Sequence, residues 1–253
     1  MGSRGSVSFD RIADRYDEPR GGLERGGNVA AAIAPHLAAG VVVEVGVGTG
    51  AVALPLVRRG HPVIGFDLSL PMLRRAHDRL GPRVARADAH HLPVAGAAAP
   101  NVVMVWVLHL VADLPAVVAE ATRILAPGGR LAVVPAGGQW DDDDIGAVVR
   151  VMHGALQDVR PHRDAPPEVV AAAEDLGLSL VAEVDTRSEV WHQSPEDQAR
   201  AIESRTWSSL WDLPDDRWAA VVEPAIAALR ALPDPARPRA RRTHYRVLVF
   251  ERP

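Results

Sequence analysis

Hydrophobic residues recur along this chain in two alternating patterns, which are short apolar runs and helical stretches with one apolar face. The apolar runs cover residues 41–45, 62–66, 101–108 and 130–134, with a weaker run at 83–86. Helical periodicity covers residues 52–59, 70–80 and 114–125. Repeated strand–helix–strand units at this spacing predict an α/β fold, with a parallel sheet covered by helices on both faces.

The pattern is less regular on both sides of this region. The first forty residues are polar and then helical, and residues 9, 12, 13 and 16 share one helical face. After residue 134 we expect helices over 141–157 and 168–176, strand character over 178–190 and a final strand over 244–250. Ser194 followed by Pro195 and two acids is typical of a helix start. Helical sequence then continues to residue 232, so we interpret 194–232 as a helical insert before the last strand, within one domain spanning 1–253.

The amino-acid composition excludes several kinds of catalytic and metal-binding site. The chain has 253 residues and no cysteine, and all 28 basic residues are arginine. Thiolate nucleophiles, cysteine-ligated metals, lysine Schiff bases and the Tyr-x-x-x-Lys pair of some dehydrogenases are therefore excluded. A formal charge of −4 gives no reason to expect a nucleic-acid partner. We see neither a signal peptide nor an apolar run long enough to cross a membrane, and we expect a cytoplasmic protein.

A glycine-rich loop follows the first expected strand. Gly46, Gly48 and Gly50 would let a ligand approach the backbone at the carboxyl edge of the sheet. The same spacing also fits a dinucleotide-binding loop. Glu44 favours a cationic ligand over a diphosphate, because it places an acid two residues before the first glycine. Asp67 ends the second strand, where a carboxylate can bind ribose hydroxyls or cap the next helix.

Five short motifs occur in order with natural spacing. They are residues 43–50 around the glycine loop, 65–73 after the second strand, 87–89 after the third, 105–110 after the fourth and the turn at 125–131. Together they resemble the class I S-adenosylmethionine-dependent methyltransferase family, in the branch that includes the ubiquinone-biosynthesis type. The resemblance covers about residues 9–134. It implies a doubly wound, seven-stranded, mostly parallel Rossmann-like sheet whose last strand is antiparallel.

The resemblance also implies S-adenosyl-L-methionine as cofactor and a set of residues that bind it. Glu44 and the glycine loop with Val47 would hold the methionine part, and Asp67 the ribose. Residues 1–40 would form an N-terminal helical lid from which Tyr16 closes over the cofactor. The remaining contacts would come from Leu68 and Met72 near the adenine, Asp88 and Ala89 at its rim, and Val105 with Trp106 beneath the cofactor.

His109 is the candidate catalytic residue, because it follows the fourth strand and histidine can accept a proton near neutral pH. A pocket-wall role is the alternative. Asp88 has the alternative of capping a turn. The acidic run 141–144 is more typical of a solvated helix start than of a metal site, so we assign no metal. We expect the arginines at 237, 239, 241 and 242 to lie in a solvated loop.

Three functions remain compatible with these residues. The first is a methyltransferase acting on a small-molecule acceptor by direct transfer, with the helical insert supplying acceptor specificity. The second is an NAD(P)-dependent dehydrogenase on the same glycine loop. The third is a non-catalytic protein that binds S-adenosylmethionine. The sequence indicates neither the acceptor nor the oligomeric state.

Overall fold

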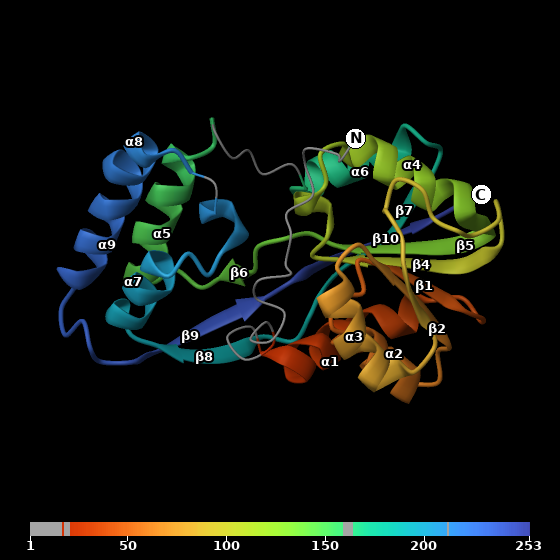
Figure 1. The fold of residues 1–253 in the computed structure, drawn as a ribbon, viewed down its shortest axis with the longest axis horizontal. Coiled ribbons are helices and arrows are strands. Elements are labelled where there is room, and N and C mark those ends of the chain that lie inside the picture. Colours follow the sequence, from red (N-terminus) through yellow and green to blue (C-terminus); the bar gives the residue numbers. More distant parts are fainter. Residues whose placement is uncertain (1–16, 18–20, 159–163, 212) are drawn as a thin grey trace. The chain divides into compact units, whose positions relative to one another are not determined.

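The computed structural model describes residues 17, 21–158, 164–211 and 213–253 (Figure 1). The chain divides into two compact units. The first contains Met1–Gly137, Arg163–Arg187 and Tyr245–Pro253, and the second contains Gly138–His162 and Ser188–His244. Among the described residues, two hydrophobic clusters lie within the first unit and one lies within the second.

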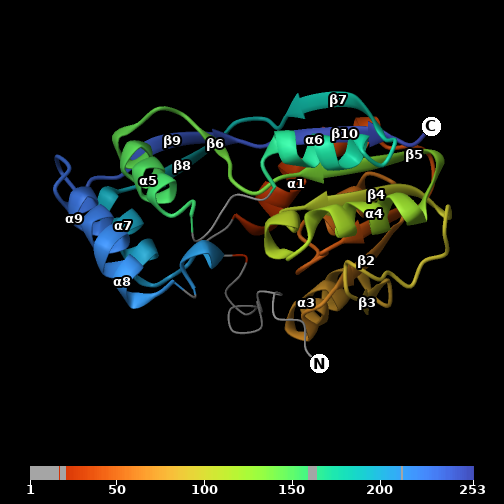
Figure 2. The same cartoon turned by 90° about the horizontal axis from the view of Figure 1, so that it is seen from above.

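A seven-stranded sheet forms the centre of the first unit. Its strands are β1 (Val42–Val45), β2 (Val63–Asp67), β3 (Val84–Arg86), β4 (Ala99–Val105), β5 (Leu125–Val134), β7 (Ser179–Asp185) and β10 (Arg246–Glu251). They lie in the order β3-β2-β1-β4-β5-β10-β7. Figure 2 labels all of these strands except β1, which is labelled in Figure 1. Neighbours from β3 to β5 are parallel, whereas β10 is antiparallel to both β5 and β7. The expected Rossmann-like sheet with an antiparallel last strand is confirmed.

Helices cover both faces of this sheet (Figure 1). They are α1 (Gly22–Ile33), α2 (Ala53–Arg58) and α3 (Leu70–Leu80) on one face, and α4 (Leu114–Ile124) and α6 (Pro166–Glu174) on the other. The side chains of β4 alternate between the faces: Val102 and Met104 join the core under α4 and α6, and Val103 and Val105 join the core under α1 to α3. This alternation explains why the apolar run is nearly continuous, since both sides of the strand are buried.

The second unit combines helices with a small sheet. Its helices are α5 (Asp144–Ala155), α7 (Pro195–Glu203), α8 (Asp215–Arg217), a π-helical turn at Trp218–Val222 and α9 (Glu223–Arg230). Its strands are β6 (Gln139–Trp140), β8 (Glu189–Gln193) and β9 (Arg239–His244), paired in the order β6-β9-β8. The predicted start of α7 is confirmed, because Ser194 and Asp197 form a capping box. The unit extends beyond the insert expected over 194–232, taking in α5 and all three strands.

The expectation of a solvated arginine loop is wrong for residues 239–242. These residues belong to β9, and the side chain of Arg241 is only 4% exposed. Its Nε lies 2.9 Å from Asp143 Oδ2, and its Nη1 donates a 2.8 Å hydrogen bond to Gln193. A buried guanidinium is tolerated when a carboxylate compensates its charge. Arg242, the next residue along the strand, is exposed as expected.

Candidate functional site

The glycine loop joins β1 to α2 and is held against the neighbouring strands. Gly46, Gly48 and Gly50 have positive φ angles of 74°, 54° and 78°. The N–H groups of Gly46 and Val47 both donate to the carbonyl of Phe66 at the end of β2, over 2.8 and 2.9 Å. A Cβ on Gly46 would lie only 2.5 Å from Val107 Cγ2, so a larger residue would displace the segment after β4. The loop is thus closely packed against the ends of both strands.

Helix α1 approaches the backbone of the same loop. A Cβ on Gly26 would lie 2.0 Å from the carbonyl oxygen of Ala51, so only glycine permits this contact. Asp17 also reaches the loop, accepting a 2.8 Å hydrogen bond from the Thr49 hydroxyl. Arg79 of α3 binds Asp17 at 2.5 Å and the Thr49 carbonyl at 2.9 Å. Sequence patterns did not single out these contacts. Tyr16, which we expected to cover the site, lies outside the described residues and stays a prediction.

Glu44 is a buried carboxyl group of the candidate site with a strongly raised pKa. It lies on β1, two residues before Gly46, and is 2% exposed. Burial in the first place, and the nearby charge of Asp67 in the second, raise the pKa of Glu44 from 4.5 to about 8. Its Oε2 is buried and has no hydrogen-bond partner among the described residues. Such a group is protonated at neutral pH and would ionise if a cation were bound beside it.

Asp67 ends β2 and binds the glycine loop. Its Oδ2 accepts a 2.8 Å hydrogen bond from Gly48 N–H, and its Oδ1 accepts one of 2.9 Å from Ser69 N–H. The expected helix cap is supplied by Ser69, whose hydroxyl accepts from Met72 N–H at 3.3 Å. Met72 is buried, whereas Leu68 is exposed beside the end of the strand. Asp67 therefore positions the loop, and its expected contact with the ribose stays a prediction.

Asp88 follows β3 and folds back onto its own turn. Its Oδ1 accepts hydrogen bonds from the N–H of His90 at 3.0 Å and from the His90 imidazole at 2.8 Å. These bonds, the backbone one first, lower the pKa of Asp88 below 3.8. Its side chain remains 44% exposed. The turn-capping alternative is thus realised, and the carboxylate is still accessible from solvent. Ala89 lies half-buried in the same turn.

The segment after β4 adds an aromatic group to the site. Val105 is buried, and Trp106 has a positive φ of 51°, which is uncommon for a residue other than glycine. The Trp106 ring packs edge-on against Tyr245, with ring centres 5.2 Å apart. The guanidinium of Arg25 from α1 lies 3.6 Å from the centre of the Trp106 ring. This cation–π contact, which involves α1 and the residue before β10, was not predicted from the sequence.

His109 lies on the short 3₁₀ turn Leu108–Leu110 that follows β4. Its side chain is 25% exposed, and its Nδ1 lies 3.8 Å from Asp164 Oδ2. Asp164 precedes α6 and is 1% exposed. It also accepts a 2.8 Å hydrogen bond from the N–H of Ala136, just after β5. Asp164 could not be singled out from the sequence, because it stands in no motif.

One expected site residue, Val47, has a side chain that is not accessible at the surface of the loop. The side chain of Val47 is buried in the core beneath the loop, where a Cβ on Gly65 would lie 2.6 Å from it. Only the backbone of Val47 can therefore contact a ligand.

Within the described part of the chain no cluster of metal-ligating side chains occurs. Asp143 instead caps α5, accepting from Gly146 N–H at 2.6 Å. No helix over these residues has the length and apolarity needed to span a bilayer.

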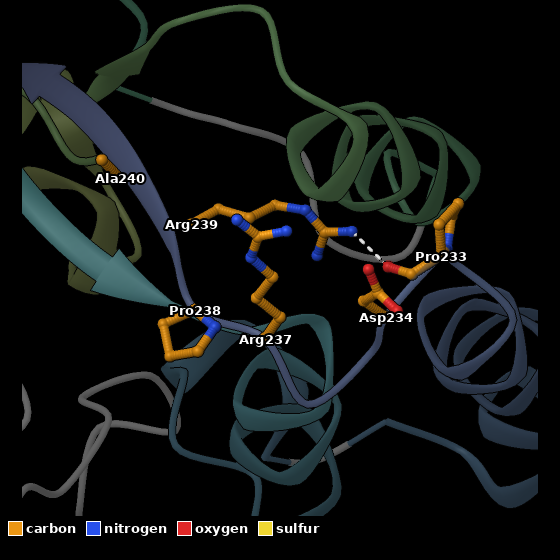
Figure 3. A pocket seen from close by; sticks show the side chains of 6 residues that line it. All are labelled: Pro233, Asp234, Arg237, Pro238, Arg239 and Ala240. Carbon is orange, nitrogen blue, oxygen red and sulfur yellow. Dashed lines mark hydrogen bonds between the residues drawn. The ribbon is translucent and has the colours of Figure 1, made fainter.

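A surface pocket of about 390 Å³ lies in the second unit and shares no residue with the glycine loop. Figure 3 shows its lining, formed by Pro233, Asp234, Arg237, Pro238, Arg239 and Ala240. Arg239 donates a 2.6 Å hydrogen bond to the Pro233 carbonyl and pairs with Asp144 at 3.1 Å. Its guanidinium is thus engaged within the protein. We therefore take the glycine loop as the candidate site, because beside it lies the buried Glu44, whose Oε2 has no hydrogen-bond partner among the described residues.

Comparisons with known proteins find methyltransferases similar to this chain. A family model described as a methyltransferase domain matches residues 43–133. The ubiquinone/menaquinone biosynthesis C-methyltransferase of Syntrophotalea carbinolica is 35% identical over 139 residues, which are 50% of this chain and 58% of that protein. The demethylmenaquinone methyltransferase of Thermus thermophilus is 36% identical over 138 residues, 50% of this chain and 63% of that protein. Residues 43–133 are a class I S-adenosylmethionine-dependent methyltransferase domain.

Solved structures extend the similarity of fold beyond this methyltransferase domain. An S-adenosylmethionine-dependent methyltransferase from Thermotoga maritima has a TM-score of 0.56 at 18% identity, covering 97% of this chain and 98% of that one. Phosphoethanolamine N-methyltransferase 2 of Haemonchus contortus, solved with S-adenosyl-L-methionine, has a TM-score of 0.53 at 18% identity. It covers 99% of this chain, which in turn covers 61% of it. The sequence matches to curated relatives, by contrast, span about three fifths of those proteins.

Proposed function

We propose that this protein transfers a methyl group from S-adenosylmethionine to a small-molecule acceptor. The observation that supports this most is Glu44, a buried acid with an oxygen that no described residue binds, beside the glycine loop. A cofactor with a sulfonium and an ammonium group would supply the missing positive charge. A dinucleotide would instead bring a diphosphate toward this acid and Asp67, which is unfavourable. The dehydrogenase alternative is therefore not favoured.

The residues around the loop fit the parts of this cofactor. Asp67 lies at the end of β2, and because a carboxylate oxygen can accept more than one hydrogen bond, its bonds to the loop are compatible with ribose hydroxyls. We assign the adenine to Leu68 and Met72, with Asp88 and Ala89 at its rim. We assign the methionine part to Glu44 and the backbone of the loop, with Val105 beneath it. We assign Tyr16 to the covering segment.

The cofactor supplies an electrophilic methyl group when it is bound, so the protein's own work is alignment. Glu44, by ionising, would compensate the charge that enters the site. The buried loop and the ring of Trp106 would limit water at the reacting centre. His109 lies on the turn after β4, where it can accept a proton if the acceptor must lose one. The family model covers residues 43–133, which contain Glu44, Asp67 and His109, whereas the relatives named for quinone biosynthesis match only half of this chain. We therefore assign the acceptor only to small organic molecules.

Calorimetry tests the cofactor assignment. Wild-type protein should bind S-adenosylhomocysteine and not NAD. Asp67→Ala should weaken this binding more than tenfold, which corresponds to about 1.4 kcal/mol or more. Asp78→Ala, on the exposed side of α3, is the matched control and should bind as the wild type does. Equal dissociation constants for Asp67→Ala and the wild type would remove Asp67 from the site.

Transfer of labelled methyl distinguishes an enzyme from a binding protein. The wild type, incubated with labelled S-adenosylmethionine and an extract of small metabolites, should produce labelled small molecules that the Asp67→Ala variant does not. Tight cofactor binding without any labelled product would favour the non-catalytic alternative. Preferential binding of NAD would reject the proposed function altogether.

A further inference from the structure

Asp164 and His109 approach each other from segments far apart in the sequence. His109 stands on the 3₁₀ turn after β4, and Asp164 stands just before α6. Asp164 Oδ2 is 3.8 Å from His109 Nδ1 and 2.8 Å from the N–H of Ala136. The segments after β4 and β5 thus both face one carboxylate. Since β4 and β5 are parallel neighbours, both segments leave the sheet at its carboxyl edge, where the glycine loop also lies.

The different burial of Asp164 and His109 shows which side of the imidazole ring faces the carboxylate. Asp164 is 1% exposed, whereas the His109 side chain is 25% exposed. The imidazole therefore turns its Nδ1 side to the buried carboxylate and keeps contact with the outside of the protein elsewhere on the ring. In a neutral imidazole one nitrogen carries the proton and the other accepts one. A carboxylate beside Nδ1 favours the form with the proton on Nδ1, which leaves Nε2 as the acceptor.

We propose that Asp164 is a positioning residue that holds His109 in its Nδ1–H form, so that Nε2 can take the proton of a hydroxyl-bearing acceptor during methyl transfer. The substrate class is thus an alcohol, phenol or enol. The separation of 3.8 Å is longer than a hydrogen bond, and such contacts commonly shorten when substrate binds. This inference rests on the proposed function for its chemical step, but the tautomer itself does not.

The step balances in atoms and charge. The acceptor oxygen forms a bond to the methyl carbon, the carbon–sulfur bond breaks, and its electron pair stays on sulfur. The hydroxyl proton passes to His109 Nε2. The positive charge that began on sulfur therefore ends on the imidazolium, which lies beside the buried carboxylate of Asp164. A carboxylate at this distance stabilises an imidazolium, so the geometry favours the product side of the proton transfer.

Nitrogen NMR of ¹⁵N-histidine protein tests the tautomer without any substrate. The chain has ten histidines, and loss of one set of signals in His109→Gln assigns the ring of interest. In the wild type the neutral His109 ring should carry its proton on Nδ1. Asp164→Asn retains an oxygen that can accept from Ala136 N–H but removes the charge, and its His109 should shift toward the Nε2–H form. Asp175→Asn, an exposed change just after α6, is the matched control and should leave the ring unchanged. The same tautomer in wild type and Asp164→Asn would overturn the proposal.

Steady-state kinetics test whether the Asp164–His109 pair contributes to methyl transfer. With labelled S-adenosylmethionine and a panel of alcohols and phenols, Asp164→Asn should lower kcat at least about tenfold, in line with the usual contribution of a general base. The KM for S-adenosylmethionine and the binding of S-adenosylhomocysteine should remain at wild-type values. A fall in cofactor binding equal to the fall in kcat would show a merely structural role and reject the proposal. Wild-type protein that binds no S-adenosylhomocysteine would reject the proposed function, and the NMR result would still decide the Asp164–His109 pairing.

Discussion

Replacing Glu44 by glutamine should make the ligand-free protein more stable and its stability less dependent on pH. Glutamine has the shape of the protonated acid but does not titrate. In the folded protein burial raises the pKa of Glu44 from 4.5 to about 8. Between these two values the unfolded chain loses its proton and the folded protein keeps it. The stability present below pH 4.5 is therefore lost progressively as the pH rises toward 8.

The magnitude follows from the width of this interval. Each pH unit between the two pKa values changes the free energy of unfolding by about 1.4 kcal/mol. With values of 4.5 and about 8, the loss from Glu44 is about 3 kcal/mol at pH 7 and about 5 kcal/mol above pH 8. The Glu44→Gln variant should thus match the wild type near pH 4.5 and exceed it by about 3 kcal/mol at pH 7.

Urea unfolding at pH 5, 7 and 9 measures this difference. The stability difference between Glu44→Gln and the wild type should grow with pH. Glu174→Gln, at the exposed end of α6, is the matched surface control, and its free energy of unfolding should stay within about 0.5 kcal/mol of the wild type. A Glu44→Gln difference that is constant from pH 5 to 9 would refute the reasoning, because it would mean that Glu44 ionises alike in the folded and unfolded chains.

The same proton should leave when the cofactor binds. A cation beside Glu44 favours its ionised form, so at pH 7 binding should release about one proton per site. Calorimetric titration of S-adenosylmethionine in buffers with different ionisation enthalpies measures this number. The release should disappear above pH 9, where Glu44 is already ionised, and in Glu44→Gln, whose affinity should also be lower. If Glu44→Gln is more stable than the wild type and also binds S-adenosylmethionine more weakly, Glu44 contributes to cofactor binding at a cost in stability.

Two further predictions concern packing. Gly46→Ala should lower the free energy of unfolding by about 1–3 kcal/mol more than Gly60→Ala, measured by urea unfolding, because both positions have positive φ but only the first lacks room for a Cβ. Equal losses would show that backbone strain alone acts. Arg241→Met should cost about 3–5 kcal/mol because it breaks a buried ion pair, whereas Arg242→Met, on the exposed face of β9, should change stability by less than about 0.5 kcal/mol. Equal thermal midpoints for these two variants would contradict the assigned burial.

The parallel part of the first unit's sheet could be predicted because its central strands are apolar and closely spaced along the chain. β2, β1, β4 and β5 are neighbours in this part of the sheet, and their apolar runs contain few polar residues. The sheet of the second unit could not be predicted in this way. Arg241 indicates exposure when taken alone, and Asp143, which compensates its charge, is 98 residues away in the sequence. Pairing over such a distance leaves no local pattern.

Local patterns also indicated the candidate site but not the hydrogen bonds of its residues. Glu44 and Asp67 could be singled out because each stands at or near the carboxyl end of a parallel strand, and the topology brings these ends to one edge of the sheet. The hydrogen bonds from Gly48 and Ser69 to Asp67 depend on the course of the loop. The raised pKa of Glu44 depends on its burial and on the nearby charge of Asp67, which no strand pattern reports.

Two residues near the carboxyl edge of the sheet, which come from segments other than the strand ends, were not predicted for the same reason. Arg25 arrives on α1, whose close approach requires Gly26 at a carbonyl oxygen of the loop. Asp164 arrives from the segment before α6 and is fixed by the N–H of Ala136. In both cases a single tertiary contact determines the position, and that contact carries no periodicity. A charged residue beside a glycine or before a helix is ordinary in sequence. Its role in the site can be inferred only from the structure, which shows that the residue packs against an aromatic ring or an imidazole.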